Sequence, residues 1–439
     1  MRQGRGRRMS ARRWYSLCAW CLLPVALLRL SLLGTRDRGY LHGWAERFGC
    51  PGRLRAPAAG RIWLHAVSVG EIQAARPLLQ RLPERFPGRR LLVTTTTPSG
   101  ARILARLGDA IDMDFAYLPF DLSFAVASFL DRCRPELAIV METEIWPNLF
   151  AACRDRGIPL VLANARLSDR SLAGYRRLPA LFRETFEAVS LVAAQDDQSA
   201  SRYRELGVPA SKLRVTGNLK FDIAFPPDME EDALRLRHEL FDDRVAWIAA
   251  STHEGEERQV LRAFRLVEAE HPGSLLILAP RHPWRQKRVL EECRRAGYPR
   301  VVCRSQGSRG PLTEPVLLLD TLGELPLFYA ASEVAFVGGS LVTHGGQNPL
   351  EPAALGVPVI AGPHYANFSS VVGLLREAGA AWIVCDYREL AGRVSQLLAD
   401  EVLRRLAGGN GREIVARHRG AADRLLRELP LGEEPEAAA

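Results

Sequence analysis

The 439-residue chain is long enough for two domains with complete cores, and its 47% hydrophobic and 25% charged residues are typical of a globular protein. The net charge of +9 would suit a nucleic-acid-binding protein, but residues 1–55 alone hold twelve arginines against one aspartate and one glutamate. Twelve minus two leaves +10 in that segment and therefore −1 in the rest of the chain. This distribution argues against nucleic acid as a partner.

The arginine-rich start surrounds an uncharged, mostly apolar run from Trp14 to Leu28, which reaches Leu33 if Arg29 is tolerated. Its length is near the minimum for a helix that spans a bilayer, and the same helix could lie in the interface. No small-residue cleavage site follows promptly, so a retained anchor is favoured over a cleaved signal peptide. We expect residues 1–55 to form a leader and a membrane anchor that binds anionic inner-membrane lipid.

Eight cysteines are scattered singly, except for Cys18 and Cys21 inside the apolar run. That pair has a spacing found in zinc sites but lacks a second pair or a histidine partner, so we expect inert thiols. Unpaired cysteines in a chain of this size suit a reducing compartment. The catalytic part is therefore expected to face the cytoplasm.

From residue 60 onward, short apolar segments alternate with helical stretches. The expected strands of the first series are RIWLHAVS, LLVTTTT, FAYLPFD, ELAIVM, IPLVLANA, SLVAAQD and LRVTGNLKF. Strands that are nearly all apolar and are separated by helices predict a parallel sheet that is covered on both faces. The Pro-rich and acidic segment DIAFPPDMEED follows and is typical of an interdomain linker.

Beyond this linker the pattern restarts with VAWIAAS, SLLILAPR, PVLLLD, EVAFVGGS, VPVIAGP and AAWIVCD. Two doubly wound, Rossmann-like α/β domains in tandem are therefore predicted, with a cleft between their strand ends. The expected boundaries after the anchor are 56–222 for the first domain, 223–233 for the linker, 234–425 for the second domain and 426–439 for a flexible tail.

Glu71, in HAVSVGEIQ, has two interpretations. Ser68 and Glu71 show the S-x-x-E spacing of a capping box, in which each side chain binds the other residue's backbone N–H at a helix start. Glu71 also follows a strand, at the edge of the sheet where ligands bind in open α/β folds. A catalytic role therefore stays open beside the structural one.

Glu142 and Glu144 directly follow the apolar strand ELAIV. Burying a carboxylate at a strand end costs free energy unless the carboxylate is paired with a cation or serves a function such as catalysis. Lys220, in TGNLKFD at the last strand of the first series, is a candidate counter-charge. A structural salt bridge and a functional site both fit this pattern.

Three loops of the second domain together predict a nucleotide pocket. In GGSLVTHGGQNPLEP, glycines precede a helix start that could bind phosphate, although Asn348, Pro349 and Glu351 equally fit a capped helix. Arg281 in LAPRHP can bind phosphate through two hydrogen bonds, and DTLGEL brings Glu324 to the same edge. Since no dinucleotide fingerprint, P-loop or metal-spaced cluster is present, we expect neither a cofactor nor a metal.

The segments HAVSVGE, TTTTPSG, YLPFD, METEIWPN, NARLSDRS, TGNLKFD, STHEGEE, APRHP, DTLGEL and FVGGSLVTHGGQNPLEPA, in this order, resemble the 3-deoxy-D-manno-octulosonic acid (Kdo) transferases of lipopolysaccharide biosynthesis. The resemblance implies a GT-B glycosyltransferase that inverts the configuration of its donor sugar. It implies transfer of Kdo from CMP-Kdo to the tetraacyldisaccharide lipid A precursor (lipid IVA). It also implies the inner membrane of a Gram-negative cell, with the catalytic domains on the cytoplasmic side.

The resemblance further implies roles for single residues. Glu71 matches the proton acceptor, and Glu142 and Lys220 match residues that support the transition state. The expected contacts to CMP-Kdo are Pro280, Arg281, Leu322, Gly323, Glu324, Asn348, Pro349, Leu350 and Glu351. A GT-B-type sugar-nucleotide epimerase and a membrane-tethered nucleotide sensor are the alternatives, and an epimerase with a soluble substrate would leave the anchor unexplained.

Overall fold

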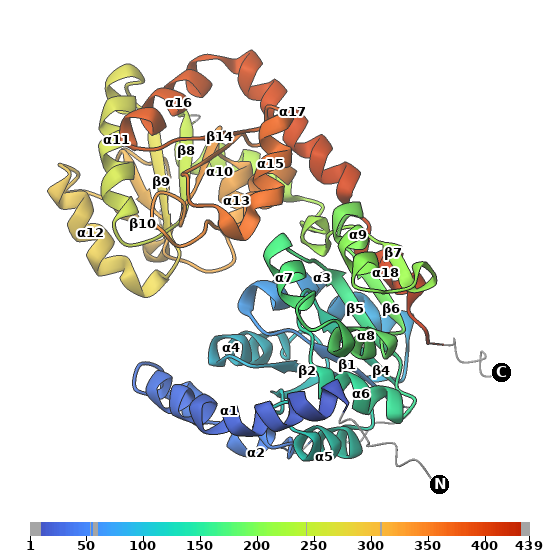
Figure 1. Cartoon of the computed structure of the whole chain (residues 1–439). Coiled ribbons are helices and arrows are strands. Elements are labelled where there is room, and N and C mark those ends of the chain that lie inside the picture. The colour runs from blue at the N-terminus through green and yellow to red at the C-terminus, as the bar shows by residue number, and fades with distance from the viewer. Residues whose placement is uncertain (1–9, 53, 56–59, 243, 308–309, 432–439) are drawn as a thin grey trace, which may run out of the picture. The chain divides into compact units, whose positions relative to one another are not determined.

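The computed structural model describes residues 10–52, 54–55, 60–242, 244–307 and 310–431. Within these ranges the chain forms two compact units (Figure 1). The first contains the chain up to Asp222 and again from Arg419, and the second is Ile223–His418. Of the expected tail, residues 432–439 lie outside the described residues, and residues 426–428 are helical.

The first unit is built on a sheet of seven parallel strands in the order β3-β2-β1-β4-β5-β6-β7. The strands are β1 (Arg61–His65), β2 (Arg90–Thr95), β3 (Met113–Tyr117), β4 (Leu137–Met141), β5 (Leu160–Ala165), β6 (Leu191–Ala194) and β7 (Leu213–Val215). The helices are α1 (Ala11–Gly34), α2 (Trp44–Arg47), α3 (Val69–Arg85), α4 (Pro98–Leu107), α5 (Ser123–Cys133), α6 (Pro147–Asp155), α7 (Asp169–Tyr175), α8 (Pro179–Glu187), α9 (Asp197–Glu205) and α18 (Ala421–Glu428). Each expected strand of the first series is present.

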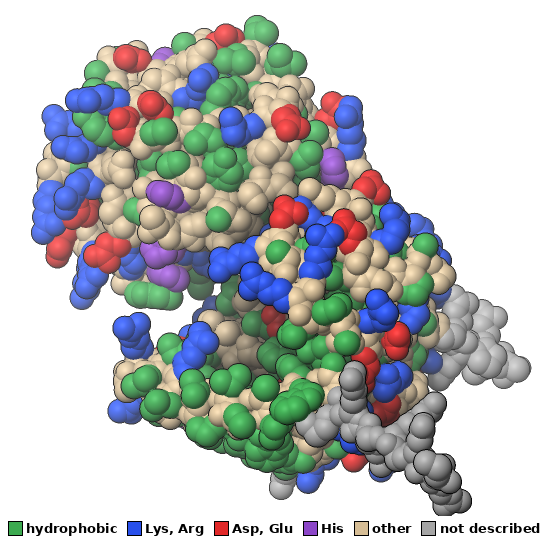
Figure 2. All heavy atoms as spheres, in the orientation of Figure 1, with side chains coloured by type: hydrophobic (Ala, Val, Ile, Leu, Met, Phe, Trp, Pro, Cys, Tyr) green, Lys and Arg blue, Asp and Glu red, His purple; other side chains and the backbone are tan. Residues whose placement is uncertain are grey.

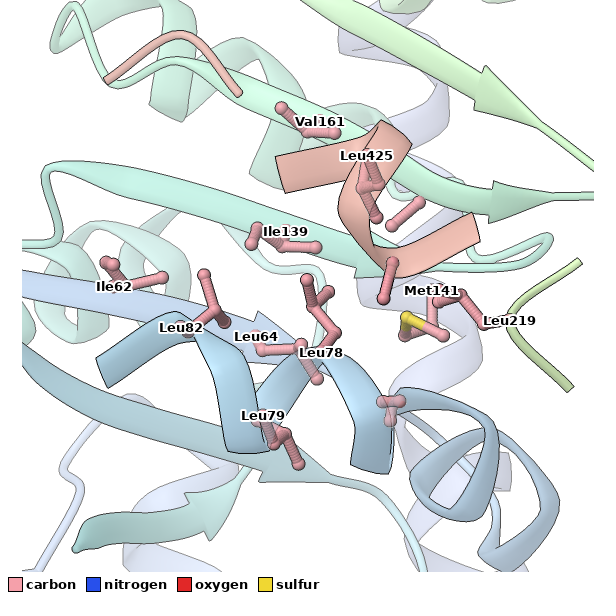
Figure 3. Close-up of a cluster of buried hydrophobic side chains, with 14 of the residues drawn as sticks. Ile62, Leu64, Leu78, Leu79, Leu82, Ile139, Met141, Val161, Leu219 and Leu425 are labelled. Atoms are coloured by element: carbon pink, nitrogen blue, oxygen red, sulfur yellow. The ribbon is translucent and has the colours of Figure 1, made fainter. Parts of the chain in front are cut away.

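Both faces of this sheet are buried. Successive residues of a strand point to opposite faces, and in β1 Leu64 joins one hydrophobic cluster while Trp63 joins the other. Leu78 and Leu82 of α3 cover the first face (Figure 3), and Phe129 of α5 belongs to the cluster on the second. This double burial explains why the strands are nearly continuous apolar runs in the sequence.

The last helix that the structure describes, α18, packs on the first unit. Its Leu425 lies in the same cluster as Leu78 and Met141 (Figure 3). The carboxylate of Asp222 accepts hydrogen bonds from backbone N–H groups at the start of α18, among them that of Ala422 at 2.6 Å. The second domain was expected to extend to residue 425, and the structure returns the chain to the first unit earlier because the apolar face of α18 is buried there.

The second unit contains another sheet of seven parallel strands, in the order β10-β11-β9-β8-β12-β13-β14. The strands are β8 (Ala246–Thr252), β9 (Leu275–Pro280), β10 (Val302–Cys303), β11 (Val316–Leu318), β12 (Val334–Val337), β13 (Val359–Ala361) and β14 (Ala381–Ile383). The helices are α10 (Met229–Leu236), α11 (Glu256–Glu270), α12 (Gln286–Arg295), α13 (Leu325–Ala330), α14 (Leu350–Ala354), α15 (Ser369–Glu377), α16 (Tyr387–Ala399) and α17 (Glu401–His418). Six of the seven strands were expected, and the seventh, β10, is a two-residue edge strand.

Candidate functional site

Two of the predicted catalytic carboxylates lie at the topological switch point of the first sheet. β1 pairs with β2 on one side and with β4 on the other, so the chain changes its direction of progress across the sheet at β1. Ligands of open α/β sheets bind outside the carboxyl ends of the strands at such a point. Glu71 lies in the first turn of α3 after β1, and Glu142 is the residue after β4.

Glu71 takes part in the helix start that its spacing predicts. The Ser68 hydroxyl accepts a hydrogen bond from the N–H of Glu71 at 3.3 Å. The Glu71 carboxylate accepts one from the N–H of Val67 at 2.7 Å. The Ser68 half of the predicted capping box is therefore present, but the Glu71 carboxylate binds the N–H of Val67 and not that of Ser68, and its other oxygen lies outside this hydrogen bond.

The surroundings of Glu71 make it a weak acid. Burial raises the pKa of Glu71 to about 7, while the hydrogen bond from Val67 acts in the opposite direction. The charges of Glu142 and Glu144 raise this pKa further, and the charge of Lys220 lowers it. A carboxyl group that titrates near neutral pH is suited to accept a proton in a reaction.

Glu142 lies between two cations. The Lys220 Nζ atom is 3.4 Å from one carboxylate oxygen of Glu142, and the Arg166 Nη2 atom is 3.8 Å from the other. Glu142 is almost fully buried and has a φ of 53°, a left-handed conformation that residues other than glycine rarely adopt. Backbone strain of this kind clusters at functional sites.

Lys220 was the expected counter-charge, and the structure brings it to Glu142. Arg166 was not singled out in the sequence. The sequence could have indicated Arg166 as a site residue, because it directly follows β5, the strand next to β4. Since parallel strands end at the same edge of a sheet, a charged residue after β5 lies close to one after β4.

The switch point of the second sheet lies between β8 and β12, and the carboxylate of the buried Glu256 lies there. One carboxylate oxygen of Glu256 accepts the N–H groups of His253 at 2.8 Å and Gly339 at 2.6 Å. The other accepts those of Ser340 and Leu341, each at 2.9 Å. The backbone N–H groups of Gly339, Ser340 and Leu341 are therefore already bound by the protein's own carboxylate and are not available to a phosphate.

The second glycine pair leads to α14, which has only five residues. Asn348 accepts the N–H of Leu350 at 3.1 Å and donates to Glu351 at 3.2 Å, so it fixes the turn before the helix, but the N-cap residue is Pro349 and not Asn348 as expected. Pro349 is the last residue before the helix. Burial raises the pKa of Glu351, and the hydrogen bond from Asn348 and the charge of Arg281 act in the opposite direction.

Arg281 follows β9, whose last residue is the buried Pro280. The Arg281 side chain is exposed. A guanidinium in this state can bind two oxygens of a phosphate.

The third predicted loop, after β11, holds Leu322, Gly323 and Glu324. Leu322 is 71% exposed, and Gly323 has a φ of 89° that suits glycine. The Glu324 carboxylate is paired with Arg304 at 2.7 Å and accepts a hydrogen bond from Thr321. Burial acts to raise the pKa of Glu324, but these hydrogen bonds outweigh it and hold the pKa below its usual value.

Three histidines that the sequence analysis did not single out lie in the loops that follow β8, β9 and β12, one in each loop. The rings of His253 and His344 stack with centroids 4.2 Å apart, and His282 meets His253 edge-on at 5.9 Å. His282 also stacks on the exposed Trp284 at 4.3 Å. Burial and the neighbouring His344 lower the pKa of His253 to about 4, so its ring is neutral at physiological pH and available for stacking.

Among the described residues, one helix, α1, is long and apolar enough to cross a membrane, with a mean hydropathy of 1.9 over 18 residues. One side of α1 contacts the first unit. The Ser16 hydroxyl donates to Asn148 at 2.8 Å, and Arg12 pairs with Glu184 at 3.4 Å. Trp20 stacks on the α5 residue Phe124 with centroids 5.4 Å apart.

The opposite side of α1 is an exposed apolar stripe. Figure 2 shows hydrophobic side chains gathered along the edge of the first unit where α1 lies in Figure 1. The stripe consists of Leu17, Leu22, Val25, Leu28 and Leu32, whose side chains are 49% to 61% exposed. Contiguous exposed apolar surface of this kind marks a membrane or protein contact.

A sequence model described as 3-deoxy-D-manno-octulosonic-acid transferase (kdotransferase) matches residues 42–223. The 3-deoxy-D-manno-octulosonic acid transferase of Haemophilus influenzae is 40% identical over 405 residues, which cover 92% of this chain and 94% of that protein. The protein of the same name from Bordetella pertussis is 41% identical over 428 residues, which cover 94% and 98%.

Solved structures give the fold. A glycosyltransferase from Rickettsia africae has a TM-score of 0.54 at 12% identity, over 84% of this chain and 96% of that one. The UDP-GlcNAc 2-epimerase of Neisseria meningitidis has a TM-score of 0.52 at 15% identity, over 84% and 100%. At these identities the likeness shows the fold alone, which is GT-B, and the predicted fold class is confirmed.

Proposed function

The chain belongs to the family of 3-deoxy-D-manno-octulosonic acid transferases, and from this premise we propose that it transfers Kdo from CMP-Kdo to the tetraacyldisaccharide lipid A precursor, with inversion. Membership of the family makes the chain a glycosyltransferase of lipopolysaccharide synthesis. The mechanism rests mainly on Glu71, the glutamate at the switch point of the first sheet. Its pKa of about 7 is far above that of an ordinary carboxyl group.

In the proposed reaction Glu71 is the general base. A hydroxyl oxygen of the acceptor attacks the anomeric carbon of Kdo, and its proton passes to the Glu71 carboxylate. The bond between the anomeric carbon and the phosphate oxygen breaks, and CMP leaves with the electron pair. A base with a pKa near the working pH is both ionised enough to accept the proton and basic enough to attract it.

Glu142 and Lys220 support this base and the transition state. Glu142 fixes the Lys220 ammonium at 3.4 Å, and the charge of Lys220 favours the ionised form of Glu71. A fixed charge in a partly buried site acts more strongly than a mobile one in water.

We assign CMP-Kdo to the strand-end loops of the second unit, with Pro280 and Arg281, Leu322 to Glu324, and Asn348 to Glu351 as its contacts. Because Glu256 occupies the N–H groups after β12, the phosphate contact falls to the exposed Arg281 guanidinium. The Glu351 carboxylate can accept hydrogen bonds from ribose hydroxyls. The proposal requires no metal and no cofactor.

Replacement of the base tests the mechanism. With CMP-Kdo and lipid acceptor in detergent, Glu71→Gln should lower turnover by about 10²- to 10⁴-fold and leave CMP binding within a few-fold. Glu84→Gln is the matched control, because Glu84 is exposed on the same helix. A Glu71→Gln enzyme with a tenth of the normal turnover would contradict the assignment. Mass spectrometry of the product separates the transferase from the epimerase alternative, which no observation favours beyond the shared fold.

We also propose that α1 lies in the plane of the inner membrane on its cytoplasmic side. A helix that crossed the bilayer would lose the contacts of Ser16 and Arg12 with the first unit. The outward stripe is apolar, and the exposed Arg29 and Arg36 can attract anionic headgroups. All eight cysteines are free thiols, which suits the reducing cytoplasm.

The position of Ser10, just before α1, distinguishes the two arrangements of the helix. A cysteine introduced at Ser10, in a variant that lacks the exposed native cysteines, is treated with an impermeant thiol reagent on sealed inverted vesicles. An in-plane helix leaves this cysteine on the cytoplasmic side, where the reagent reaches it. Labelling that requires detergent would mean that α1 spans the membrane.

A further inference from the structure

The turn that carries Lys220 is held by a buried side chain from another strand. Asn164 is the next-to-last residue of β5 and is fully buried. Its side-chain oxygen accepts the backbone N–H of Leu219 at 2.9 Å. Leu219 begins the short 3₁₀ turn Leu219–Phe221, of which Lys220 is the middle residue.

Asn164 lies directly beside Glu142. In the β4–β5 ladder Met141 is opposite Ala163, and the N–H of Glu142 donates to the Ala163 carbonyl at 2.9 Å. Glu142 and Asn164 therefore stand at neighbouring positions, and each has a φ of 53°. One strand end supplies the carboxylate, and the next supplies the oxygen that fixes the turn bearing its counter-ion.

The rest of the turn is fixed as well. Leu219 and Phe221 are buried, and the N–H of Lys220 donates to the Asn218 side chain at 3.0 Å. On the far side, Asp222 binds the first N–H groups of α18. With its backbone held from both sides, Lys220 extends from this turn to Glu142 at 3.4 Å.

We propose that Asn164 is a positioning residue that holds the Lys220 ammonium against Glu142, at the edge of the sheet where Glu71 also lies. The inference rests on the proposed function, because it assigns Lys220 to the same reaction. Asparagine suits the place for two reasons. It tolerates the left-handed conformation, and its uncharged amide oxygen accepts the Leu219 N–H without adding a third negative charge near the two carboxylates.

A merely structural role would have a different outcome. If Asn164 only satisfied the Leu219 N–H, its loss would lower stability and leave the chemistry of the remaining folded enzyme unchanged. A positioning role acts through Lys220. Loss of Asn164 should then change turnover and the pH dependence of the base, because the charge of Lys220 lowers the pKa of Glu71.

The test is a double-mutant cycle with Asn164→Gly and Lys220→Met. Glycine adopts a φ of 53° freely, so the first variant removes the side chain with its acceptor oxygen and does not strain the backbone. We expect Asn164→Gly to lower kcat by about 10- to 100-fold, as misplacement of a catalytic group does. The acid limb of its pH profile should move to higher pH. In the Lys220→Met background, Asn164→Gly should change kcat by less than about twofold.

Gln195→Ala is the matched control. The Gln195 side chain donates to the backbone oxygen of Asn164 at 3.0 Å, so this variant removes a buried hydrogen bond at the same strand end without touching the turn of Lys220. We expect lower stability with unchanged kcat and an unchanged acid limb. If Asn164→Gly does not fold, Asn164→Ser replaces it in the cycle, because the serine hydroxyl is too short to reach Leu219.

The outcomes separate the inference from the proposed function. If Lys220→Met leaves kcat unchanged, this result contradicts both the role of Lys220 in the reaction and the positioning role of Asn164. If Lys220→Met lowers kcat but Asn164→Gly does not, only the positioning role falls. It also falls if the two losses multiply in the double variant. Loss of kcat in both single variants without further loss in the double variant supports it.

Discussion

Glu71→Gln, which removes the proposed base, should also stabilise the folded protein, and this stabilisation should grow as the pH rises towards 7. A carboxyl group whose pKa is higher in the folded state binds its proton more tightly there than in the unfolded chain. Between the two pKa values the folded state holds more protons, so the stability of the unmodified enzyme falls as the pH rises through this range. Glu71→Gln abolishes this fall because glutamine does not ionise.

The size of the effect follows from the surroundings of Glu71. Burial raises its pKa from the ordinary 4.5 to about 7. One pKa unit corresponds to about 1.4 kcal/mol, so the ionised carboxylate should destabilise the folded first unit by about 3 kcal/mol above pH 7. At pH 5 most of this penalty is absent, and it amounts to about 1 kcal/mol. Glutamine keeps an oxygen that can accept the N–H of Val67, so the helix start loses little.

The assay is thermal unfolding of Glu71→Gln and of the unmodified enzyme at pH 5 and pH 8 in the same detergent. The unfolding midpoint of Glu71→Gln should exceed that of the unmodified enzyme clearly at pH 8 and only slightly at pH 5. Glu84→Gln, an exposed position on the same helix, should show no such difference. An equal effect of Glu71→Gln at both pH values, or destabilisation at pH 8, would refute the reasoning that burial makes Glu71 a weak acid.

Three further predictions concern other parts of the chain. Arg281→Ala and Glu351→Ala should each raise the KM for CMP-Kdo through lost phosphate and ribose contacts, and unchanged CMP affinity of both variants in titration calorimetry would place the nucleotide elsewhere. Deletion of residues 1–33 should release the protein from vesicles in flotation assays and spare activity on detergent-dispersed acceptor, whereas full membrane binding after deletion would mean that another surface docks. Glu256→Gln should destabilise the second unit by about 1–3 kcal/mol, because an amide cannot accept four hydrogen bonds from the N–H groups that Glu256 binds; an unchanged unfolding midpoint would contradict this account.

Local features of this protein were predictable from neighbouring residues. The apolar runs predicted thirteen of the fourteen strands, and the two-residue β10 was too short to give a signal. The spacing of Ser68 and Glu71 predicted the helix start, since it depends on three residues of chain. Glu142, Arg281 and the loop before α14 were found because each follows a strand, and parallel strands end at the same edge of a sheet.

Contacts between distant residues were decided by the tertiary structure. Arg166 meets Glu142, and Asn164 holds Leu219, because β4 and β5 are neighbours and the chain returns to the same edge after β7. Composition predicted the apolar helix α1, but only its contacts show that one side rests on the first unit. Three of the four N–H groups that the Glu256 carboxylate binds come from more than eighty residues along the chain. Short-range spacing determines helices and strands. Pairings between distant residues depend instead on the order of the strands within the sheet and on which side chains the packed sheet brings within hydrogen-bonding distance.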